Sequence, residues 1–291
     1  MAKTINDVYM QLYKRFREAG EPQPSLAARE LTAYACRVDR SHTAEWGHVY
    51  LDDATVDYAH LLCDRCLDGE PLAYILGEWD FYGLTFAVDR SVLIPRADTE
   101  RLCELAIERA RTRVSPRILD LCCGSGCIGV AAAHEVEDAR VTAVDNADGA
   151  LRLTRKNARR HGVQGRLTAV KADVLDLPPA KIGEFDILVS NPPYVTRAEM
   201  EQLEPSVAAY EPHEALYGGP DGLDFYRAIC AGWGSLLVPR GVILFECGWR
   251  QAQDVAAILE ENGFAGIRIE EDLAGVQRVV LGVAVPAADR L

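Results

Sequence analysis

The sequence predicts an α/β fold, in which a small helical domain precedes a doubly wound, mostly parallel sheet. From residue 98 onward, short apolar runs typical of buried strands alternate with segments of helical periodicity. Before residue 79, apolar residues recur at helical spacing, as between Ile5 and Phe16, without the alternation typical of strands. The last two extended runs, 267–272 and 277–285, predict an antiparallel hairpin at one edge of the sheet.

The α/β region spans residues 98–291 and repeats the order of strand, turn and helix. A glycine-containing turn after its first strand opens a helix, which is the usual start of a ligand-binding βα unit. We expect helices over 99–113, 128–136, 149–162, 223–237 and 251–263, and strands over 117–123, 141–145, 166–173, 185–190 and 242–247.

Residues 1–78 form the predicted N-terminal helical domain. Gly20 is a natural stop for the first helix, and Ser25 is placed to cap the second. A third helix is expected near 54–67.

Residues 79–97 are expected to link the two domains as a β-hairpin. The extended runs LTFAV and VLI lie on either side of Asp89, Arg90 and Ser91, which are suited to a turn.

The composition narrows the class of protein. The 291 residues carry a net charge of -13, which disfavours generic binding to nucleic acid. No apolar run approaches the roughly 20 residues that span a bilayer, and the N-terminus lacks a signal-peptide pattern. Nine cysteines, an odd number, indicate free thiols in a reducing compartment. We therefore expect a cytoplasmic monomer that binds neither membrane nor nucleic acid stably.

A metal is not expected. Cys63 and Cys66 have the spacing of half a zinc site, but no second pair lies at finger or ribbon spacing. Two thiols on the core face of a helix are the favoured interpretation.

The segment from Asp120 to Gly126 lies where the first strand of the sheet turns into a helix. Gly124 and Gly126 allow a ligand to approach the backbone closely. The second strand ends at Asp145, nineteen residues after Gly126, and a carboxylate there can accept both hydroxyls of a ribose. A nucleoside that donates a methyl group fits this arrangement. A dinucleotide site stays open because Gly129 completes Gly-x-Gly-x-x-Gly, and so does a purely structural turn.

The strand at 185–190 runs into Asn191-Pro192-Pro193-Tyr194, the most informative feature of the sequence. Two prolines stiffen the turn and remove two donors, so its carbonyl groups are available as acceptors. The Asn191 side chain adds an acceptor oxygen, and Tyr194 adds an aromatic face for a planar group. Paired acceptors suit an NH2 group, whose delocalised lone pair makes nitrogen a poor nucleophile. The alternative is an ordinary proline turn, which the glycine-rich turn at the first strand makes less favoured.

The chain resembles the protein-(glutamine-N5) methyltransferases along nearly its whole length. Besides the tetrad, the resemblance is carried by GEPLAYILGEWDFYGLTFAVDRSVLIPRADTE (69–100), LDLCCGSGCIGVA (119–131), EPHEALYGGPDGLDFYRAI (211–229), FECGWRQAQ (245–253) and DLAGVQRVV (272–280). The block at 69–100 is the specific one, because other amino-methylating enzymes share the tetrad.

The resemblance implies the class I methyltransferase fold with S-adenosyl-L-methionine as the cofactor. It also implies an N-terminal domain that docks a peptide chain release factor, whose Gly-Gly-Gln glutamine enters the tetrad. The implied catalytic residues are Asn191, Pro192, Pro193 and Tyr194, and the implied cofactor-binding residues are Asp120, Cys122, Cys123, Gly124, Ser125, Gly126, Asp145, Asp173, Val174 and Asn191.

Two features bear on the substrate. Thr99-Glu100 is the ending typical of the release factor enzymes, and Arg96 and Glu100 are expected near the cofactor. Cys122 is instead shared with similar enzymes that methylate a ribosomal large-subunit protein. That protein therefore remains an alternative substrate, and adenine-N6 methylation of nucleic acid is another, disfavoured by the acidic charge.

Overall fold

A computed structural model describes residues 2–39, 45–272 and 274–285. The chain divides into two compact units. The first comprises Met1–Glu78 with Pro205–Tyr210, and the second comprises Trp79–Glu204 with Glu211–Leu291. Each unit has a hydrophobic core of its own.

The first unit is helical, as the sequence predicts. Thr4 caps its first helix through a capping box with Asp7. The expected cap at Ser25 is wrong: the second helix begins one residue earlier, at Pro24, because proline suits the first helical position. The elements are β1 (Lys3–Thr4), α1 (Ile5–Glu18), α2 (Pro24–Cys36), β2 (Tyr50–Leu51), α3 (Asp53–Leu67), α4 (Leu72–Leu76) and α9 (Pro205–Tyr210).

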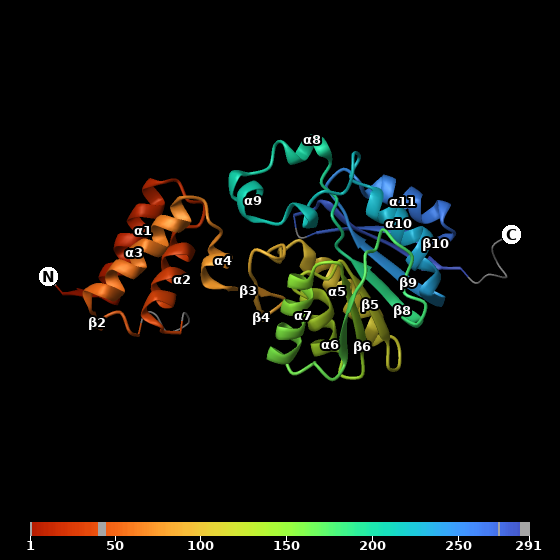
Figure 1. Ribbon diagram of the computed structural model, residues 1–291, viewed down its shortest axis with the longest axis horizontal. Helices are drawn as coiled ribbons and strands as arrows, with labels where there is room; N and C mark the ends of the chain where they lie inside the picture. The colour runs from red at the N-terminus through yellow and green to blue at the C-terminus, as the bar shows by residue number, and fades with distance from the viewer. Residues whose placement is uncertain (1, 40–44, 273, 286–291) are drawn as a thin grey trace. The chain divides into compact units, whose positions relative to one another are not determined.

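The second unit is built on a seven-stranded sheet of order β10-β11-β9-β8-β5-β6-β7. Figure 1 labels β10, β9, β8, β5 and β6 of this sheet. The strands β9, β8, β5, β6 and β7 are parallel, and β11 pairs antiparallel with both β9 and β10, which confirms the predicted edge hairpin. The strands are β5 (Arg117–Leu121), β6 (Arg140–Asp145), β7 (Leu167–Lys171), β8 (Phe185–Ser190), β9 (Leu237–Glu246), β10 (Phe264–Glu271) and β11 (Gln277–Ala284).

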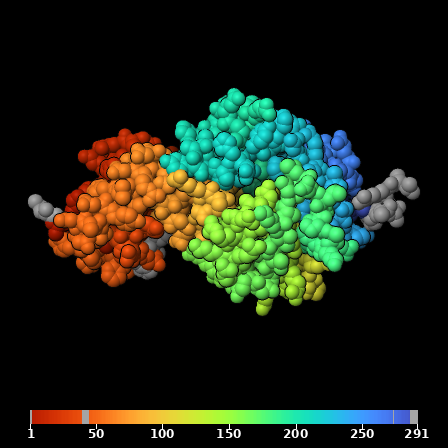
Figure 2. Space-filling view, viewed as in Figure 1, coloured from red at the N-terminus to blue at the C-terminus, as the bar shows by residue number. Residues whose placement is uncertain are grey.

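Helices cover both faces of this sheet. One buried cluster joins the strands to α5 (Thr99–Arg111), α6 (Cys127–Glu135) and α7 (Asp148–Arg160), and a second joins them to α10 (Asp224–Gly232), η3 (Trp233–Leu236) and α11 (Ala252–Glu261). In the space-filling view, segments from the whole length of this unit, coloured yellow to blue, lie together (Figure 2). The fold is therefore the predicted doubly wound α/β sheet. The order along the sheet reverses between β5 and β8, which is where open α/β sheets bind ligands.

The predicted pairing of the hairpin in residues 79–97 is wrong. The two strands are β3 (Glu78–Phe81) and β4 (Leu84–Ala87), and the run VLI at 92–94 is not a strand. Tyr82 and Gly83 form the turn, with φ of 50° and 72°. A two-residue hairpin turn of type I′ has positive φ at both positions, and tyrosine gives no sequence signal for that conformation. Residues 88–98 instead form a loop that contributes to the site described below.

Two short helices complete the second unit, α8 (Arg197–Met200) and η2 (His213–Ala215). Among the described residues, no helix is long and apolar enough to cross a membrane.

Candidate active site

A pocket opens at the carboxyl ends of four parallel strands. Cys122 follows β5, Asp145 ends β6, Asp173 follows β7 and Asn191 follows β8. This edge is where open α/β sheets bind their ligands. The pocket is lined by Ser91, Val92, Leu93, Pro95, Arg96, Thr99, Cys122, Cys123, Gly124, Ser125, Cys127, Ile128, Asp145, Asn146, Ala147, Ala150, Ala172, Asp173, Val174, Asn191, Pro193, Pro212, Glu214, Ala215 and Phe225.

The loop between β5 and α6 forms one wall of the pocket. Cys122, Gly124 and Gly126 all have positive φ, of 56°, 53° and 78°. A Cβ added at Gly124 would meet nothing within 4 Å, so the backbone there is open to a ligand. At Gly126, which does not line the pocket, a Cβ would lie 2.9 Å from the Thr154 Cγ2 atom. Gly124 therefore faces the ligand space, whereas Gly126 allows close packing against α7.

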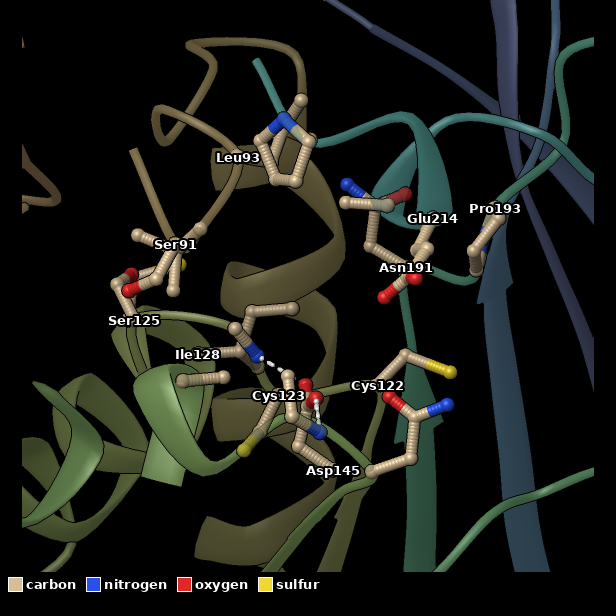
Figure 3. A pocket seen from close by; sticks show the side chains of 18 of the residues that line it. Ser91, Leu93, Cys122, Cys123, Ser125, Ile128, Asp145, Asn191, Pro193 and Glu214 are labelled. Atoms are coloured by element: carbon tan, nitrogen blue, oxygen red, sulfur yellow. Dashed lines mark hydrogen bonds between the residues drawn. The ribbon is translucent and has the colours of Figure 1, made fainter. Parts of the chain in front are cut away.

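Asp145 lies at the bottom of the pocket in Figure 3. Its Oδ2 atom accepts a hydrogen bond of 2.9 Å from the Gly124 N–H, and Oδ1 accepts one of 3.0 Å from the Ala147 N–H. Each carboxylate oxygen can accept a second hydrogen bond, so the side chain retains capacity for ligand hydroxyls. Burial raises the pKa of Asp145 above its ordinary value, against the hydrogen bonds that lower it.

Asp120 is not one of the residues that line the pocket. Its buried side chain faces α6, where Oδ2 accepts a 2.9 Å hydrogen bond from the Gly129 N–H. A Cβ at Gly129 would lie 2.8 Å from that same oxygen, so the third glycine of the Gly-x-Gly-x-x-Gly match allows close strand–helix packing. Burial raises the pKa of Asp120 to about 7. The geometry makes Asp120 a support for the loop rather than a ligand contact.

Asp173 and Val174 form the wall beyond β7. Val174 is buried, and Asp173 Oδ1 accepts a 2.9 Å hydrogen bond from the Leu175 N–H. Asp173 Oδ2 also accepts a 3.4 Å hydrogen bond from the Asn146 amide nitrogen. An apolar surface bordered by polar groups suits one edge of a planar heterocycle.

The tetrad lies at the end of β8, where Asn191 and Pro193 line the pocket beside Glu214 (Figure 3). The Asn191 amide nitrogen donates a 3.1 Å hydrogen bond to the Thr99 hydroxyl. Within the described ranges, no group donates to the Asn191 Oδ1 atom or to the Pro192 carbonyl. Both of these acceptors therefore lack a protein donor in the described part of the chain.

Pro192 and Tyr194 do not line the pocket themselves. Pro192 is buried, and the Tyr194 hydroxyl donates a 3.4 Å hydrogen bond to Glu246 at the end of β9. The Tyr194 carbonyl accepts from the Gln251 side chain at 3.0 Å. These bonds fix the tetrad from behind, and the predicted stacking role of Tyr194 stays a prediction.

The sequence indicated several residues of this site only as parts of a family block, without roles. Glu211 is buried, accepts a hydrogen bond from the Ile94 N–H at 3.3 Å and pairs with Arg96, which lines the pocket as expected. Glu100 does not line it, because its carboxylate accepts a 2.8 Å hydrogen bond from the Tyr82 N–H. Thr99 and Glu246 were not predicted as site residues at all.

Comparisons with known proteins place the chain in a class and then in a family. Residues 100–207 match the family described as methyltransferase small domain, and residues 7–77 match the PrmC N-terminal domain. The structure is similar to that of a methyltransferase from Pyrococcus furiosus, with a TM-score of 0.50, 16% identity, and coverage of 77% of this chain and 98% of that one. That similarity shows a shared fold, and the match over residues 100–207 gives the class of protein as a methyltransferase.

Two curated relatives define the family. The release factor glutamine methyltransferase of Geobacter sulfurreducens is 44% identical over 213 residues, which is 73% of each chain. The one from Clostridium botulinum is 34% identical over 276 residues, covering 95% of this chain and 98% of that one. The chain belongs to the release factor glutamine methyltransferase family.

Proposed function

We propose that this enzyme transfers a methyl group from S-adenosyl-L-methionine to the N5 amide nitrogen of the glutamine in the Gly-Gly-Gln motif of a release factor. The observation that carries the proposal is the Asn191 side chain, whose Oδ1 atom has no donor among the described residues, at a pocket whose other walls suit a nucleoside. The relatives are named for the same reaction.

The pocket residues fit S-adenosyl-L-methionine. The open backbone at Gly124 can lie against it, Asp145 can accept from its ribose hydroxyls, and Val174 can contact its adenine. When bound, it supplies a sulfonium methyl group to a nucleophile.

The tetrad prepares a weak nucleophile. Asn191 Oδ1 and the Pro192 carbonyl accept the two hydrogens of the substrate NH2 group and so withdraw its nitrogen from conjugation. Because both acceptors are fixed in place, they stabilise positive charge on that nitrogen as it gains the methyl group. Holding the nitrogen at attack distance lowers the barrier further. The nitrogen then loses one hydrogen as a proton to water.

The test is parallel methylation of intact release factor, ribosomal large-subunit protein and duplex DNA, read by mass spectrometry as the gain of one methylene group. We expect the release factor alone to be modified, at its glutamine. A release factor with Glu in place of that Gln should be inert, because a carboxylate lacks the NH2 donors and would face two acceptors. Modification of the ribosomal protein alone, or of adenine alone, would refute the substrate assignment.

The role of residues 1–78 is tested with a short Gly-Gly-Gln peptide. The peptide presents the amide but loses docking contacts and must be ordered on binding, so intact release factor should be the better substrate. Deletion of residues 1–78 should remove most of that preference while leaving weak activity on the peptide. Equal preference in the truncated and full chains would argue against a docking role.

A further inference from the structure

Thr99, the first residue of α5, lies directly behind the catalytic asparagine. It is 3% exposed, and its hydroxyl accepts the 3.1 Å hydrogen bond from the Asn191 amide nitrogen across a sequence separation of 92 residues. In the described part of the molecule, this is the one hydrogen bond of the Asn191 side chain. The orientation of the amide therefore depends on Thr99.

That orientation decides what the tetrad can bind. The two ends of an asparagine amide have nearly the same shape but opposite hydrogen-bonding character. With Oδ1 toward the pocket, Asn191 offers an acceptor to an NH2 group. Rotated by half a turn, it would present its own NH2 group and repel the substrate amide.

A threonine hydroxyl alone cannot select between these orientations, because it can donate or accept. Glu246 makes the selection. Its carboxylate is 1% exposed and accepts a 3.4 Å hydrogen bond from the Tyr194 hydroxyl. The Thr99 hydroxyl is close enough to lower the pKa of Glu246 as a hydrogen-bonding neighbour. An ionised carboxylate only accepts, so the Thr99 proton points at Glu246 and its lone pair is left for the Asn191 NH2 group.

The surroundings of Glu246 keep it available as an acceptor. Arg278, which pairs with Asp98 and Asp272, acts on it as a positive charge, and Asp98 acts as a negative one. Its Oε2 atom is buried without a hydrogen-bond partner among the described residues, so the carboxylate has spare acceptor capacity. Burial nevertheless raises the pKa of Glu246 to about 7, so the ionised form gives way to the protonated form near neutral pH.

We propose that Thr99 is a positioning residue that, with Glu246, fixes the Asn191 amide so that its oxygen faces the nitrogen to be methylated. Asn191 donates a hydrogen bond to Thr99, and Thr99 donates one to Glu246. Each acceptor fixes the orientation of the group that donates to it. The inference rests on the proposed function, since it explains how the same site selects an amide over a carboxylate.

The experiment compares Thr99→Val with Thr99→Ser in the full chain, using intact release factor as the substrate. Valine keeps the volume but removes the hydroxyl, so turnover should fall about tenfold or more, with affinity for S-adenosylhomocysteine little changed. Serine should restore most of the turnover.

Two further measurements distinguish a positioning role of Thr99 from a purely structural one. In Thr99→Val the amide is free to rotate, so the Glu variant of the release factor should become a competitive inhibitor about tenfold tighter than with wild type. Turnover of the wild type should rise as pH increases through about 7, where Glu246 ionises, and both Thr99→Val and Glu246→Gln should lose that rise.

The outcomes distinguish the inference from the proposed function. If wild type does not methylate release factor, the proposed function fails. If wild type does and Thr99→Val equals it, the positioning role fails. It also fails if turnover falls but serine does not restore it and inhibition by the Glu variant is unchanged. If Thr99→Val does not bind S-adenosylhomocysteine, the pH profile of Glu246→Gln decides.

Discussion

At the scale of single residues, the site consists of acceptors placed at two ends of one pocket. Asp145 accepts from the backbone of its own loop and keeps lone pairs for a ligand. Among the residues that the structure describes, the Asn191 side chain makes one hydrogen bond, to Thr99, and its oxygen has no donor. Neither role needs a side chain that changes protonation during the reaction, because fixed dipoles supply the stabilisation.

Replacing Asp145 tests the cofactor end. Asp145→Ala should weaken binding of S-adenosylhomocysteine by about 1.5–3 kcal/mol, the range for hydrogen bonds to charged groups. Asp145→Asn keeps one acceptor oxygen and similar volume, so its loss should be smaller. Calorimetry measures both, with NADH as a ligand expected not to bind. Unchanged affinity in Asp145→Ala would remove the ribose assignment.

Replacing Asn191 tests the acceptor end. Asn191→Ala removes an interaction that strengthens as the nitrogen becomes positive, so the loss should fall on turnover more than on KM. Binding of S-adenosylhomocysteine should largely survive, which makes it the control for folding. Turnover within about threefold of wild type, under ~1 kcal/mol of transition-state energy, would show that the tetrad is not catalytic.

At the scale of elements, the parallel sheet explains why these residues meet. Parallel strands place their carboxyl ends at one edge, so the residues after β5, β6, β7 and β8 converge on one pocket. The glycines of the β5–α6 loop let that loop turn tightly into α6 beside α7. The loop can lie this close to Thr154 on α7 because Gly126 has no side chain.

Alanine substitutions at two glycines with similar φ distinguish the cost of lost packing space from the cost of backbone strain. Gly126 has φ of 78° and Thr154 lies against it, whereas Gly162 has φ of 70° and open space around it. Gly162→Ala should cost about 1 kcal/mol of unfolding free energy, from the positive φ alone. Gly126→Ala should cost about 1–3 kcal/mol more and weaken S-adenosylhomocysteine binding, because Thr154 holds the Gly124 carbonyl. Urea unfolding and calorimetry measure the pair; equal losses in both variants would contradict the packing argument.

At the scale of the whole molecule, two buried carboxyl groups should make stability depend on pH. Burial raises the pKa of Glu246 from 4.5 to about 7, and that of Asp120 from 3.8 to about 7. Between the unfolded and folded pKa values, the native state binds more protons than the unfolded state. The stability that these groups contribute is therefore fully present below about 4 and is lost as pH rises through about 7.

The measurement is urea unfolding of wild type and Glu246→Gln between about pH 5 and 8. The stability difference between the two proteins should shift toward the variant as pH rises, because glutamine cannot ionise. The comparison cancels the opposite contributions of carboxylates whose pKa is lowered, such as Asp89 beside Arg152 and Ser91. Parallel pH profiles of the two proteins would show that Glu246 does not titrate in this range.

The sequence by itself determined the alternation of strands and helices, the antiparallel edge, the glycine turn after the first strand, and the ends of the strands at Asp145 and Asn191. These depend on periodicity and turn chemistry within short windows, which adjacent residues encode directly. Tertiary structure decided that Thr99 and Glu246 stand behind Asn191, that Asp120 faces α6, and that the hairpin pairs 78–81 with 84–87. These arrangements depend on contacts between residues distant in the chain, or on a positive φ that a tyrosine in the sequence does not predict. No local pattern therefore specifies them.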